Sequence, residues 1–280
     1  MDLKPGLYLV STPIGNLNDI TLRALEVLKN SDIIFCENTR ISRKLLLKHF
    51  ITTPLSVYND KSNNVTRGRI IKSIDSGKAV ALISDAGTPL ISDPGYKLVR
   101  KLKEMDYHID IIPGVSSPIA ALTISGLASN KFVFSGFLPK TDMGREELFK
   151  KLKDLDSTLI FFDNPVRILS SLVVALKTLG NRQANISREL TKLFQESKTN
   201  DLLTLIAYYK NKTPKGEIVL LISGKKIAGL DKEELTREVK MLLLLGKKAK
   251  TITEELFEKY RKSYSKHSIY KICNLMKTEK

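Results

Sequence analysis

Residues 79–95 read AVALISDAGTPLISDPG and are the most informative stretch of this chain. The apolar run Ala79–Ile83 predicts a fully buried strand of the kind found in parallel sheets. Gly, Pro and other small residues follow at once, with Asp85 at the tip of the loop. Asp93 and Pro94 are typical of a helix N-cap and a first helical residue. The pattern predicts a strand, a loop and a helix, with a small polar ligand at the carboxyl edge of an α/β sheet.

Two further predicted strands end in loops of the same kind. Residues 6–11 lead into TPIG at 12–15, and residues 109–112 lead into PGVSSP at 113–118. We expect the three strand ends to converge on one crevice, although each loop taken alone is also compatible with an ordinary strand–loop–helix joint. None of the loops has the three spaced glycines of a dinucleotide site or the Gly-Lys-Ser/Thr of a phosphate-binding loop. The ligand is therefore not expected to be held chiefly by its phosphates.

These motifs, with their neighbours, resemble a known family. Residues 7–40, 79–100 and 111–139 are similar to the tetrapyrrole-methylase superfamily, and most of all to its branch that methylates ribosomal RNA. RELTK at 188–192 and KGE at 215–217 fit the same branch in the same order. The resemblance covers nearly the whole chain. It implies S-adenosylmethionine as cofactor and methylation of the ribose 2′-hydroxyl of a decoding-centre cytidine, position 1402 of 16S ribosomal RNA.

Apolar runs alternate with amphipathic segments along the chain, which predicts α/β architecture. Helices are expected at 116–128 and 166–179, among others. The resemblance implies two α/β domains of the tetrapyrrole-methylase type with the cofactor in the interdomain cleft. We place these domains at residues 1–128 and 129–225, followed by a small basic helical region at 226–280. Strands are expected near residues 6–11, 32–36, 79–84, 109–112, 131–135, 157–162, 184–188 and 217–222.

The charge balance favours a polyanionic partner. The chain has 46 Lys+Arg against 30 Asp+Glu, a formal net charge of +16. Such an excess suits nucleic acid or an anionic membrane surface, and a lysine-rich proteome is the alternative source of part of it. No apolar run approaches the roughly 18 residues of a membrane span, and no signal-peptide pattern opens the chain. With the resemblance, these features predict a cytoplasmic protein that acts on 16S ribosomal RNA or the small ribosomal subunit, with no membrane partner.

The last part of the chain is basic and helical in pattern. Residues 225–280 contain 15 Lys/Arg against 8 Asp/Glu, and their apolar residues at helical spacing predict three short helices. Such a unit resembles a small helix-turn-helix, whose basic faces could bind RNA phosphates; the alternative is a solvated tail packed on the catalytic body. Candidate RNA-binding residues are Lys247, Lys248, Lys266 and Lys271, on faces that also carry Lys250, Lys259, Arg261 and Lys262.

The chemistry of methyl transfer suggests which loop residues contact the cofactor. Transfer from a sulfonium is an in-line displacement, so the main task of the protein is alignment. A carboxylate suits the positive sulfonium and the ribose hydroxyls, which makes Asp85 the first candidate, with Thr88 beside it. Ser116 and Ser117 would offer hydroxyl and amide groups to the carboxylate of the cofactor at a helix N-terminus.

Three more cofactor contacts follow from the resemblance alone. Pro13, near the end of the first strand, lines the adenosine side in relatives. Phe162 and Leu190 occupy positions where relatives contact the cofactor from the second domain. Ordinary packing or capping is the alternative role of each of these residues.

A ribose hydroxyl also needs a group that accepts its proton or polarises its oxygen. Glu37 and Arg40 are the candidate catalytic residues, and a phosphate contact is the alternative role of Arg40. Relatives often carry Glu-Asp-Thr-Arg here, so Asn38 removes one carboxylate. Residues 58–60 and 162–167 stand where relatives carry histidine, which argues against a histidine base. The sequence leaves the proton acceptor undecided.

Metal chemistry is not expected. Cys36 and Cys273 have no neighbour at metal-ligand or redox spacing, and the three histidines are scattered. Both cysteines are expected to be buried thiols.

Three functions therefore compete. The first is an RNA ribose methyltransferase, which forms a homodimer if it follows its relatives. The second is a tetrapyrrole-like small-molecule methylase of the same fold, which the basic C-terminal helices disfavour. The third is a non-catalytic RNA-binding protein, which the intact ligand loops disfavour.

Overall fold

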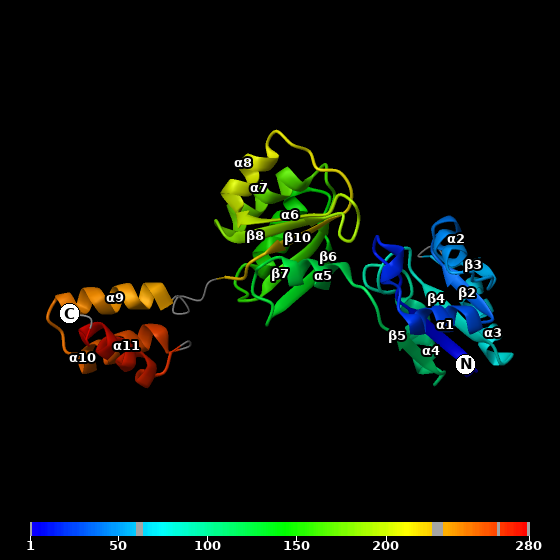
Figure 1. The fold of residues 1–280 in the computed structure, drawn as a ribbon, viewed down its shortest axis with the longest axis horizontal. Helices are drawn as coiled ribbons and strands as arrows, with labels where there is room; N and C mark the ends of the chain where they lie inside the picture. The colour runs from blue at the N-terminus through cyan, green and yellow to red at the C-terminus, as the bar shows by residue number, and fades with distance from the viewer. Residues whose placement is uncertain (1, 60–63, 226–231, 262–263, 279–280) are drawn as a thin grey trace. The chain divides into compact units, whose positions relative to one another are not determined.

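The computed structural model describes residues 2–59, 64–225, 232–261 and 264–278. The chain divides into two compact units, one formed by residues 1–153 and 157–223, the other by 154–156 and 224–280. Within the described residues, the first unit contains two five-stranded sheets and the second contains three helices (Figure 1). The predicted division of the α/β part after residue 128 falls between the helix α5 (Ser117–Ile124) and the strand β6 (Phe132–Phe137) and stays a prediction.

The first sheet is entirely parallel, with strand order β3-β2-β4-β1-β5. In its centre Leu9 lies opposite Leu82 on one neighbouring strand and Ile111 on the other. Four of its strands were predicted, whereas the three-residue β3 was not. The strands are β1 (Gly6–Val10), β2 (Ile33–Cys36), β3 (Leu55–Val57), β4 (Ala79–Ile83) and β5 (Ile109–Ile112).

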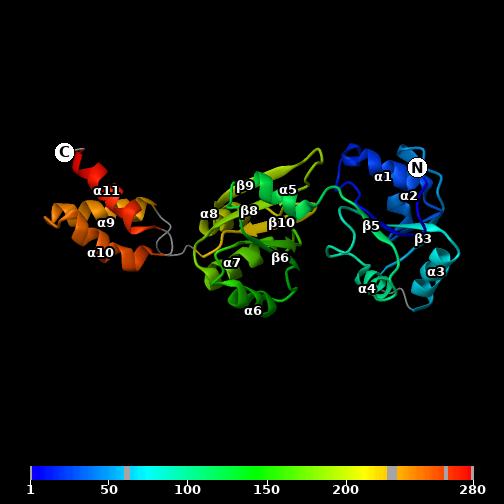
Figure 2. The same ribbon diagram turned by 90° about the horizontal axis from the view of Figure 1, so that it is seen from below.

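Helices cover both faces of this sheet, which explains the continuous apolar runs of its strands. Val10 and Ile83 pack in a cluster with residues of α1 and α2, whereas Leu7 and Leu82 pack with α3 and α4 on the opposite face (Figure 2). A short 3-10 turn, η1 (Leu17–Asp19), precedes the first helix. The helices are α1 (Leu22–Asn30), α2 (Thr39–Lys48), α3 (Asn64–Asp75) and α4 (Tyr96–Glu104).

The second sheet is mixed, with strand order β6-β7-β10-β8-β9. Only the pair β6 and β7 is parallel; β10 runs antiparallel to β7 and β8, and β9 runs antiparallel to β8. The strands are β6 (Phe132–Phe137), β7 (Thr158–Asp163), β8 (Gln183–Arg188), β9 (Glu196–Asp201) and β10 (Ile218–Ile222).

Strand β9 was not predicted, because its sequence ESKTND has no apolar alternation. Its backbone pairs with that of β8, and polar side chains add to the pairing. The buried amide of Asn185 donates hydrogen bonds to Ser197 at 2.8 Å and Thr199 at 2.7 Å. Without these bonds the buried amide of Asn185 would have no partner, which costs free energy.

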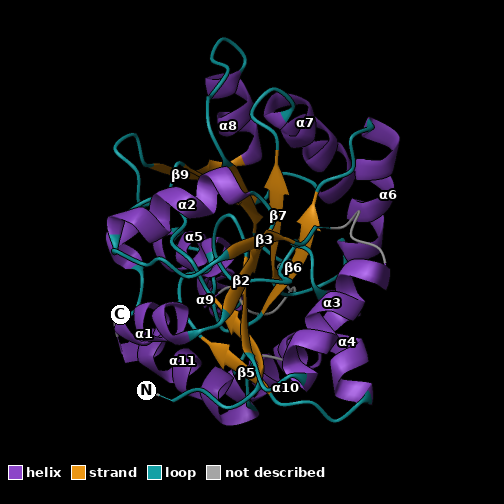
Figure 3. Ribbon diagram, turned by 90° about the vertical axis from the view of Figure 1, so that its right-hand side faces the viewer, coloured by secondary structure: helices purple, strands orange, loops and turns teal. Residues whose placement is uncertain are grey.

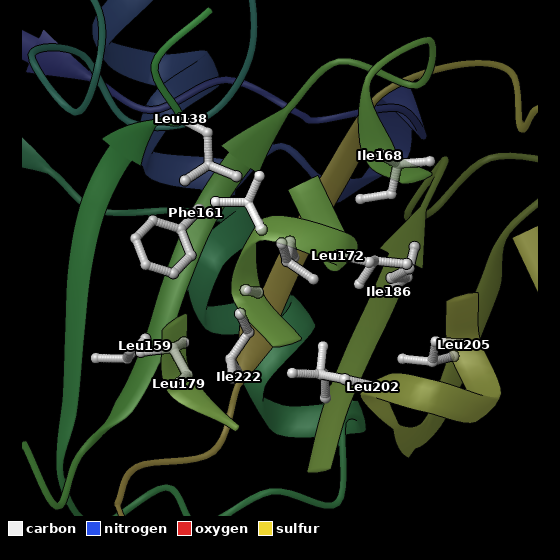
Figure 4. Close-up of a cluster of buried hydrophobic side chains, with 14 of the residues drawn as sticks. Leu138, Leu159, Phe161, Ile168, Leu172, Leu179, Ile186, Leu202, Leu205 and Ile222 are labelled. Carbon is white, nitrogen blue, oxygen red and sulfur yellow. The ribbon is translucent and has the colours of Figure 1, made fainter. Parts of the chain in front are cut away.

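Alternate side chains of the second sheet face different helices. Phe161, Ile186 and Ile222 point into a core with α6, α7 and α8, to which Leu172 and Leu202 contribute (Figure 4). The opposite face packs against α5, the helix that follows β5. The helices are α5 (Ser117–Ile124), α6 (Asp142–Leu152), α7 (Ile168–Leu179) and α8 (Leu202–Tyr209).

Two predicted helix limits in the α/β unit were wrong. Helix α4 begins at Tyr96 after Gly95, which has φ +136°, and not at Pro94 after an Asp93 cap. The chain from Leu90 to Gly95 instead turns through left-handed conformations, with φ +71° at Leu90 and +65° at Ser92. A Cβ on Gly95 would lie 2.8 Å from Leu90 Cδ1, so the turn is packed tightly at this point.

The helix predicted at 116–128 is shorter than expected and ends at Ile124. The hydroxyl of Ser125 donates to the Leu122 carbonyl at 2.8 Å and accepts the Leu127 N–H at 3.0 Å. Gly126 then adopts φ +70°, a left-handed conformation with which the helix cannot continue.

The second unit has its own apolar core between α9 (Lys232–Leu244), α10 (Ala249–Tyr260) and α11 (Lys266–Thr278). Val239, Ile252 and Ile269, one from each helix, are fully buried in this core. The three helices predicted from the spacing of apolar residues are confirmed, as is the alternation of strands and helices before them (Figure 3). No helix in the described residues is long and apolar enough to span a membrane.

Candidate active site

The three predicted ligand loops meet at the carboxyl end of the parallel sheet. Thr12 and Gly87 exchange two backbone hydrogen bonds, of 2.8 and 3.0 Å, which join the loops after β1 and β4. The hydroxyl of Thr88 lies 3.1 Å from that of Ser11 and donates to the Val115 carbonyl at 3.2 Å. One threonine side chain thus connects the ends of three strands, β1, β4 and β5.

The loop after β5 requires a glycine at position 114, because it passes very close to Ser11 at the end of β1. A Cβ on Gly114 would lie 2.8 Å from Cβ of Ser11, closer than real Cβ atoms approach one another. The small residues predicted to mark a ligand loop therefore allow two strand-end loops to pack directly together.

Asp85 is joined to the loop that follows β2. Its Oδ1 accepts the backbone N–H of Asn38 at 3.1 Å. Burial raises the pKa of Asp85 above its ordinary value, and the Asn38 N–H partly offsets this rise. The side chain of Asn38 caps α2 by accepting the Arg40 N–H at 3.0 Å. Glu37 and Arg40, the predicted catalytic residues, are exposed on either side of Asn38.

A cavity of about 700 Å³ opens beside these loops and is also lined by the second sheet. Six predicted cofactor residues line it: Asp85, Thr88, Ser116, Ser117, Phe162 and Leu190. Pro13 is buried and does not line the cavity, although its neighbour Ile14 does. Glu37 and Arg40 do not line it either. Cys36 and Cys273 are buried thiols, as predicted.

The loop after β8 brings Leu190 to this cavity through a strained backbone. Glu189 and Thr191, on either side of Leu190, have φ +49° and +63°. The Thr191 hydroxyl accepts the Asn16 N–H at 3.0 Å. A Cβ on Gly15 would lie 2.9 Å from the Leu190 carbonyl oxygen, so the loops after β1 and β8 are in direct contact.

An ionic network holds the same loop on the cavity wall. The Glu189 carboxylate accepts the Glu217 N–H at 3.0 Å and the Lys192 ammonium at 2.9 Å. Lys192 also binds the Glu217 carboxylate at 3.0 Å. Burial opposes ionisation of Glu189, but these hydrogen bonds and the Lys192 charge hold its pKa below the usual value.

The residues present fit S-adenosylmethionine. Ser116 is the N-cap of α5 but makes no capping hydrogen bond with its side chain, so its hydroxyl can serve a ligand. An amino-acid carboxylate is favoured at such a helix start, and a positive sulfonium is favoured near Asp85. No cluster of three His, Cys, Asp or Glu side chains suited to a metal ion occurs among the residues that the structure describes.

Several residues that line the cavity were assigned no role from the sequence. On the side of the second sheet these include Phe137, Lys140, Asp163 and Arg167. The run 162–167 already stood out by its departure from relatives, whereas nothing in the sequence marked Lys140.

The predicted RNA-binding lysines belong to the second unit. Lys247 is paired with Glu255 at 2.6 Å, and the Lys266 ammonium lies 5.2 Å from the centroid of the Phe257 ring. Lys248 and Lys271 are exposed. Lys262 lies outside the described residues.

Known proteins resemble this chain in sequence and fold. Residues 6–206 match the family model "Tetrapyrrole (Corrin/Porphyrin) Methylases". The ribosomal RNA small subunit methyltransferase I of Rickettsia prowazekii is 52% identical over 277 residues, 99% of each chain. The protein of the same name from Haemophilus influenzae is 38% identical over 278 residues, 96% of each chain.

Solved structures share the fold at much lower identity. A diphthine synthase aligns with a TM-score of 0.62 and 15% identity, over 78% of this chain and 89% of its own. The methyltransferase CobJ aligns with a TM-score of 0.57 and 16% identity, over 79% of this chain and 94% of its own. With the family match and the full-length relatives, this chain belongs to the tetrapyrrole methylase family of methyltransferases, among the ribosomal RNA small subunit methyltransferase I proteins.

Proposed function

We propose that this protein transfers a methyl group from S-adenosylmethionine to the ribose 2′-hydroxyl of cytidine 1402 in 16S ribosomal RNA. The observation that carries the proposal is the 52% identity, over 99% of both chains, to a curated ribosomal RNA small subunit methyltransferase I. The cavity supports it, because six of the seven predicted cofactor residues line one space of about 700 Å³, a size suited to a small organic ligand.

The proposed roles follow from the chemistry of the cavity residues. S-adenosylmethionine would supply an electrophilic methyl group on a positively charged sulfur. Asp85 stabilises that charge and accepts hydrogen bonds from ribose hydroxyls, while Ser116 and Ser117 donate to a carboxylate at the start of α5. Thr88 holds the three loops in register, which fixes the alignment on which in-line transfer depends.

The second sheet completes the proposed cofactor site. Phe162 and Leu190 supply apolar surface on the facing wall, and Ile14 supplies it beside the buried Pro13. Glu37 and Arg40 remain the proposed residues for the acceptor hydroxyl, on the segment that Asn38 joins to Asp85. Because neither lines the cavity, their part of the proposal requires the ribose of the target nucleotide to lie at the edge of the cavity, beside the loop after β2.

The wider assignments are part of the same proposal. The RNA substrate is 16S ribosomal RNA or the small subunit, with phosphates bound by Lys247, Lys248, Lys266 and Lys271. The protein is proposed to be a cytoplasmic homodimer, as its relatives lead us to expect. Analytical ultracentrifugation of the purified chain measures the oligomeric state, and a monomer at micromolar concentration would remove the dimer from the proposal.

The experiment that tests the function is methylation of small subunits from a strain that lacks this protein. The purified protein and S-adenosylmethionine are added, and nucleosides are analysed by mass spectrometry with primer extension across the decoding centre. We expect one new 2′-O-methylcytidine at the target position. No gain of ribose methylation on free RNA or assembled subunits would refute the proposed reaction.

A further inference from the structure

The wall of the cavity on the second sheet combines an aromatic ring with two cations. Phe137, the last residue of β6, is 64% exposed although it lines the cavity, and its ring centroid lies 5.1 Å from that of Phe162. Lys140 and Arg167 are the cationic side chains that line the cavity among the described residues. None of these three side chains has a role in the proposed cofactor site.

A buried arginine fixes the segment that carries Lys140. The side chain of Arg145 is 2% exposed, and its guanidinium donates to the backbone carbonyls of Pro139 at 3.0 Å and Lys140 at 3.2 Å. It also donates to Asp142 and, at 2.6 Å, to Ser170 in the first turn of α7. Arg145 thus holds the backbone of Lys140 close to the start of α7.

A buried carboxylate fixes Arg167 at the same place. Arg167 immediately precedes α7, and its Nη2 lies 3.7 Å from Oδ1 of Asp163, whose side chain is fully buried. Asp163 Oδ2 and Arg167 Nε are buried and have no hydrogen-bond partner among the described residues. Asp163 Oδ1 itself accepts the Asn164 N–H at 2.7 Å, so only one oxygen of this carboxylate lacks a partner. Buried polar atoms without a partner are rare in proteins, and a bound water or ligand at the cavity wall accounts for them here.

The two sides of the cavity therefore differ in chemistry. Asp85 and Asp93 carry negative charge on the loop after β4, which suits the cationic cofactor. The opposite wall carries the carboxylates Asp163 and Glu217, but these are paired with Arg167 and Lys192. It also offers the exposed ring of Phe137 and the cations Lys140 and Arg167. Proteins bind a single-stranded nucleotide with such groups: aromatic rings stack on the base, and Lys or Arg bind phosphates.

We propose that Phe137, Lys140 and Arg167 form the subsite for the methylated nucleotide of the RNA and its flanking phosphates. Phe137 stacks on the base of the nucleotide, which leaves the helical stack of the RNA to enter the cavity. Lys140 and Arg167 bind the adjacent phosphates, while Arg145 and Asp163 are positioning residues. This inference rests on the proposed RNA methyltransferase function and assigns its substrate side.

Three single variants test the subsite on the full-length protein: Phe137→Ala, Lys140→Ala and Arg167→Ala. Steady-state kinetics with unmethylated small subunits give KM for the RNA and kcat, and calorimetry gives Kd for S-adenosylmethionine. We expect Phe137→Ala to raise KM for the RNA by about fivefold or more, since base–aromatic stacking contributes about 1–3 kcal/mol. Lys140→Ala and Arg167→Ala should each weaken RNA binding and lower the slope of log Kd against log salt by about one. Kd for the cofactor should change less than about twofold in all three.

Matched controls come from exposed residues outside the cavity. Phe194, 68% exposed on the loop after β8, and Lys101, exposed on α4, do not line it. Phe194→Ala and Lys101→Ala should leave KM for the RNA unchanged.

The role of Asp163 is tested by a double-mutant cycle. If Asp163 acts by orienting Arg167, Asp163→Asn raises KM for the RNA in the wild-type background and adds nothing to Arg167→Ala. A merely structural Asp163 would give additive effects together with a lower melting temperature, and would overturn its positioning role.

The outcomes separate this inference from the proposed function. A wild-type protein that methylates RNA while all three variants keep its KM overturns the subsite and leaves the function standing. Loss of cofactor affinity in parallel with RNA affinity assigns this wall to the adenosine of the cofactor and likewise overturns the subsite. Absence of RNA methylation by the wild-type protein overturns the proposed function itself.

Discussion

The backbone N–H of Asn38 donates a hydrogen bond to Oδ1 of Asp85 over 3.1 Å, across 47 residues of sequence. The bond joins the loop after β2 to the loop after β4, and it ties the proposed catalytic segment to the proposed cofactor carboxylate. Since the same asparagine caps α2 with its side chain, the position of that helix and the electrostatics of Asp85 depend on one residue.

Asp85→Asn should weaken the binding of S-adenosylmethionine about tenfold to a hundredfold, because a charge-assisted contact contributes about 1.5–3 kcal/mol. In the wild type, cofactor affinity should fall as the pH is lowered through the pKa of Asp85, which burial places above the ordinary value. Asp85→Asn should abolish this pH dependence. Calorimetry across the acidic range measures both effects, and a variant with wild-type affinity would exclude Asp85 from the cofactor site.

The same substitution should make the fold slightly more stable at neutral pH. A carboxyl group whose pKa is raised by folding binds protons more tightly in the folded state. Its ionisation therefore lowers the free energy of unfolding as the pH rises from the unfolded pKa through the folded pKa. Urea denaturation at neutral pH measures this effect, and a variant clearly less stable than the wild type would contradict the sign.

Asn38→Asp should leave stability within about 0.5 kcal/mol, because Asp and Asn cap helices equally well. The added negative charge should raise the pKa of Asp85 further and move the acid loss of cofactor affinity to higher pH. The exposed residue Asn181, whose side chain accepts the Leu203 N–H at 3.1 Å, offers a control in Asn181→Asp. An unshifted pH profile for Asn38→Asp would show that position 38 does not influence Asp85.

Gly216→Ala should destabilise the protein by more than about 2 kcal/mol, since it adds a clash to an unfavourable backbone conformation. Gly216 has φ +89°, and a Cβ there would lie 2.3 Å from Glu189 Oε1. Gly180 has a similar φ of +81°, with ψ −179° and nothing within 4 Å of its Cβ position, so Gly180→Ala isolates a backbone cost on the order of 1–3 kcal/mol without a clash. If urea denaturation shows the same loss of stability for Gly216→Ala and Gly180→Ala, the Glu189 network does not depend on the close approach of Gly216.

Lys248→Ala combined with Lys271→Ala should reduce the salt dependence of RNA binding more than Lys247→Ala does. Lys247 is already neutralised by Glu255, whereas Lys248 and Lys271 have no ion pair in the described part of the chain. Removing one lysine–phosphate interaction lowers the slope of log Kd against log salt by about 0.7–0.9. Filter binding at several salt concentrations measures the slope, and unchanged slopes would mean that these helices do not hold the RNA.

Continuous apolar runs were the reliable signal for the fold. The runs at β4 and β10 are buried on both faces, so their sequences allow little besides a central strand. Strand β9 was missed and the start of α4 was predicted wrongly, and both errors have the same cause. The polar side chains of β9 receive hydrogen bonds from Asn185 on the neighbouring strand. Leu90 and Gly95 pack against each other within a turn, and no local sequence pattern reveals that contact.

The same distinction applies to the candidate site. Asp85, Thr88 and Ser116 were found because strand-end loops of small residues are local features that parallel strands bring together. Lys140 and Arg167 gave no comparable signal, since their shared position depends on the buried side chains of Arg145 and Asp163.

By itself the sequence determined the family, the alternation of the apolar strands with helices, and the three loops of the first sheet, because these depend on neighbours along the chain. Only the tertiary structure decided which wall of the cavity each charge lines, where α4 begins and how the polar edge strand is held. Those outcomes depend on contacts such as Asn38 with Asp85 and Arg145 with Lys140, which form only when the chain has packed.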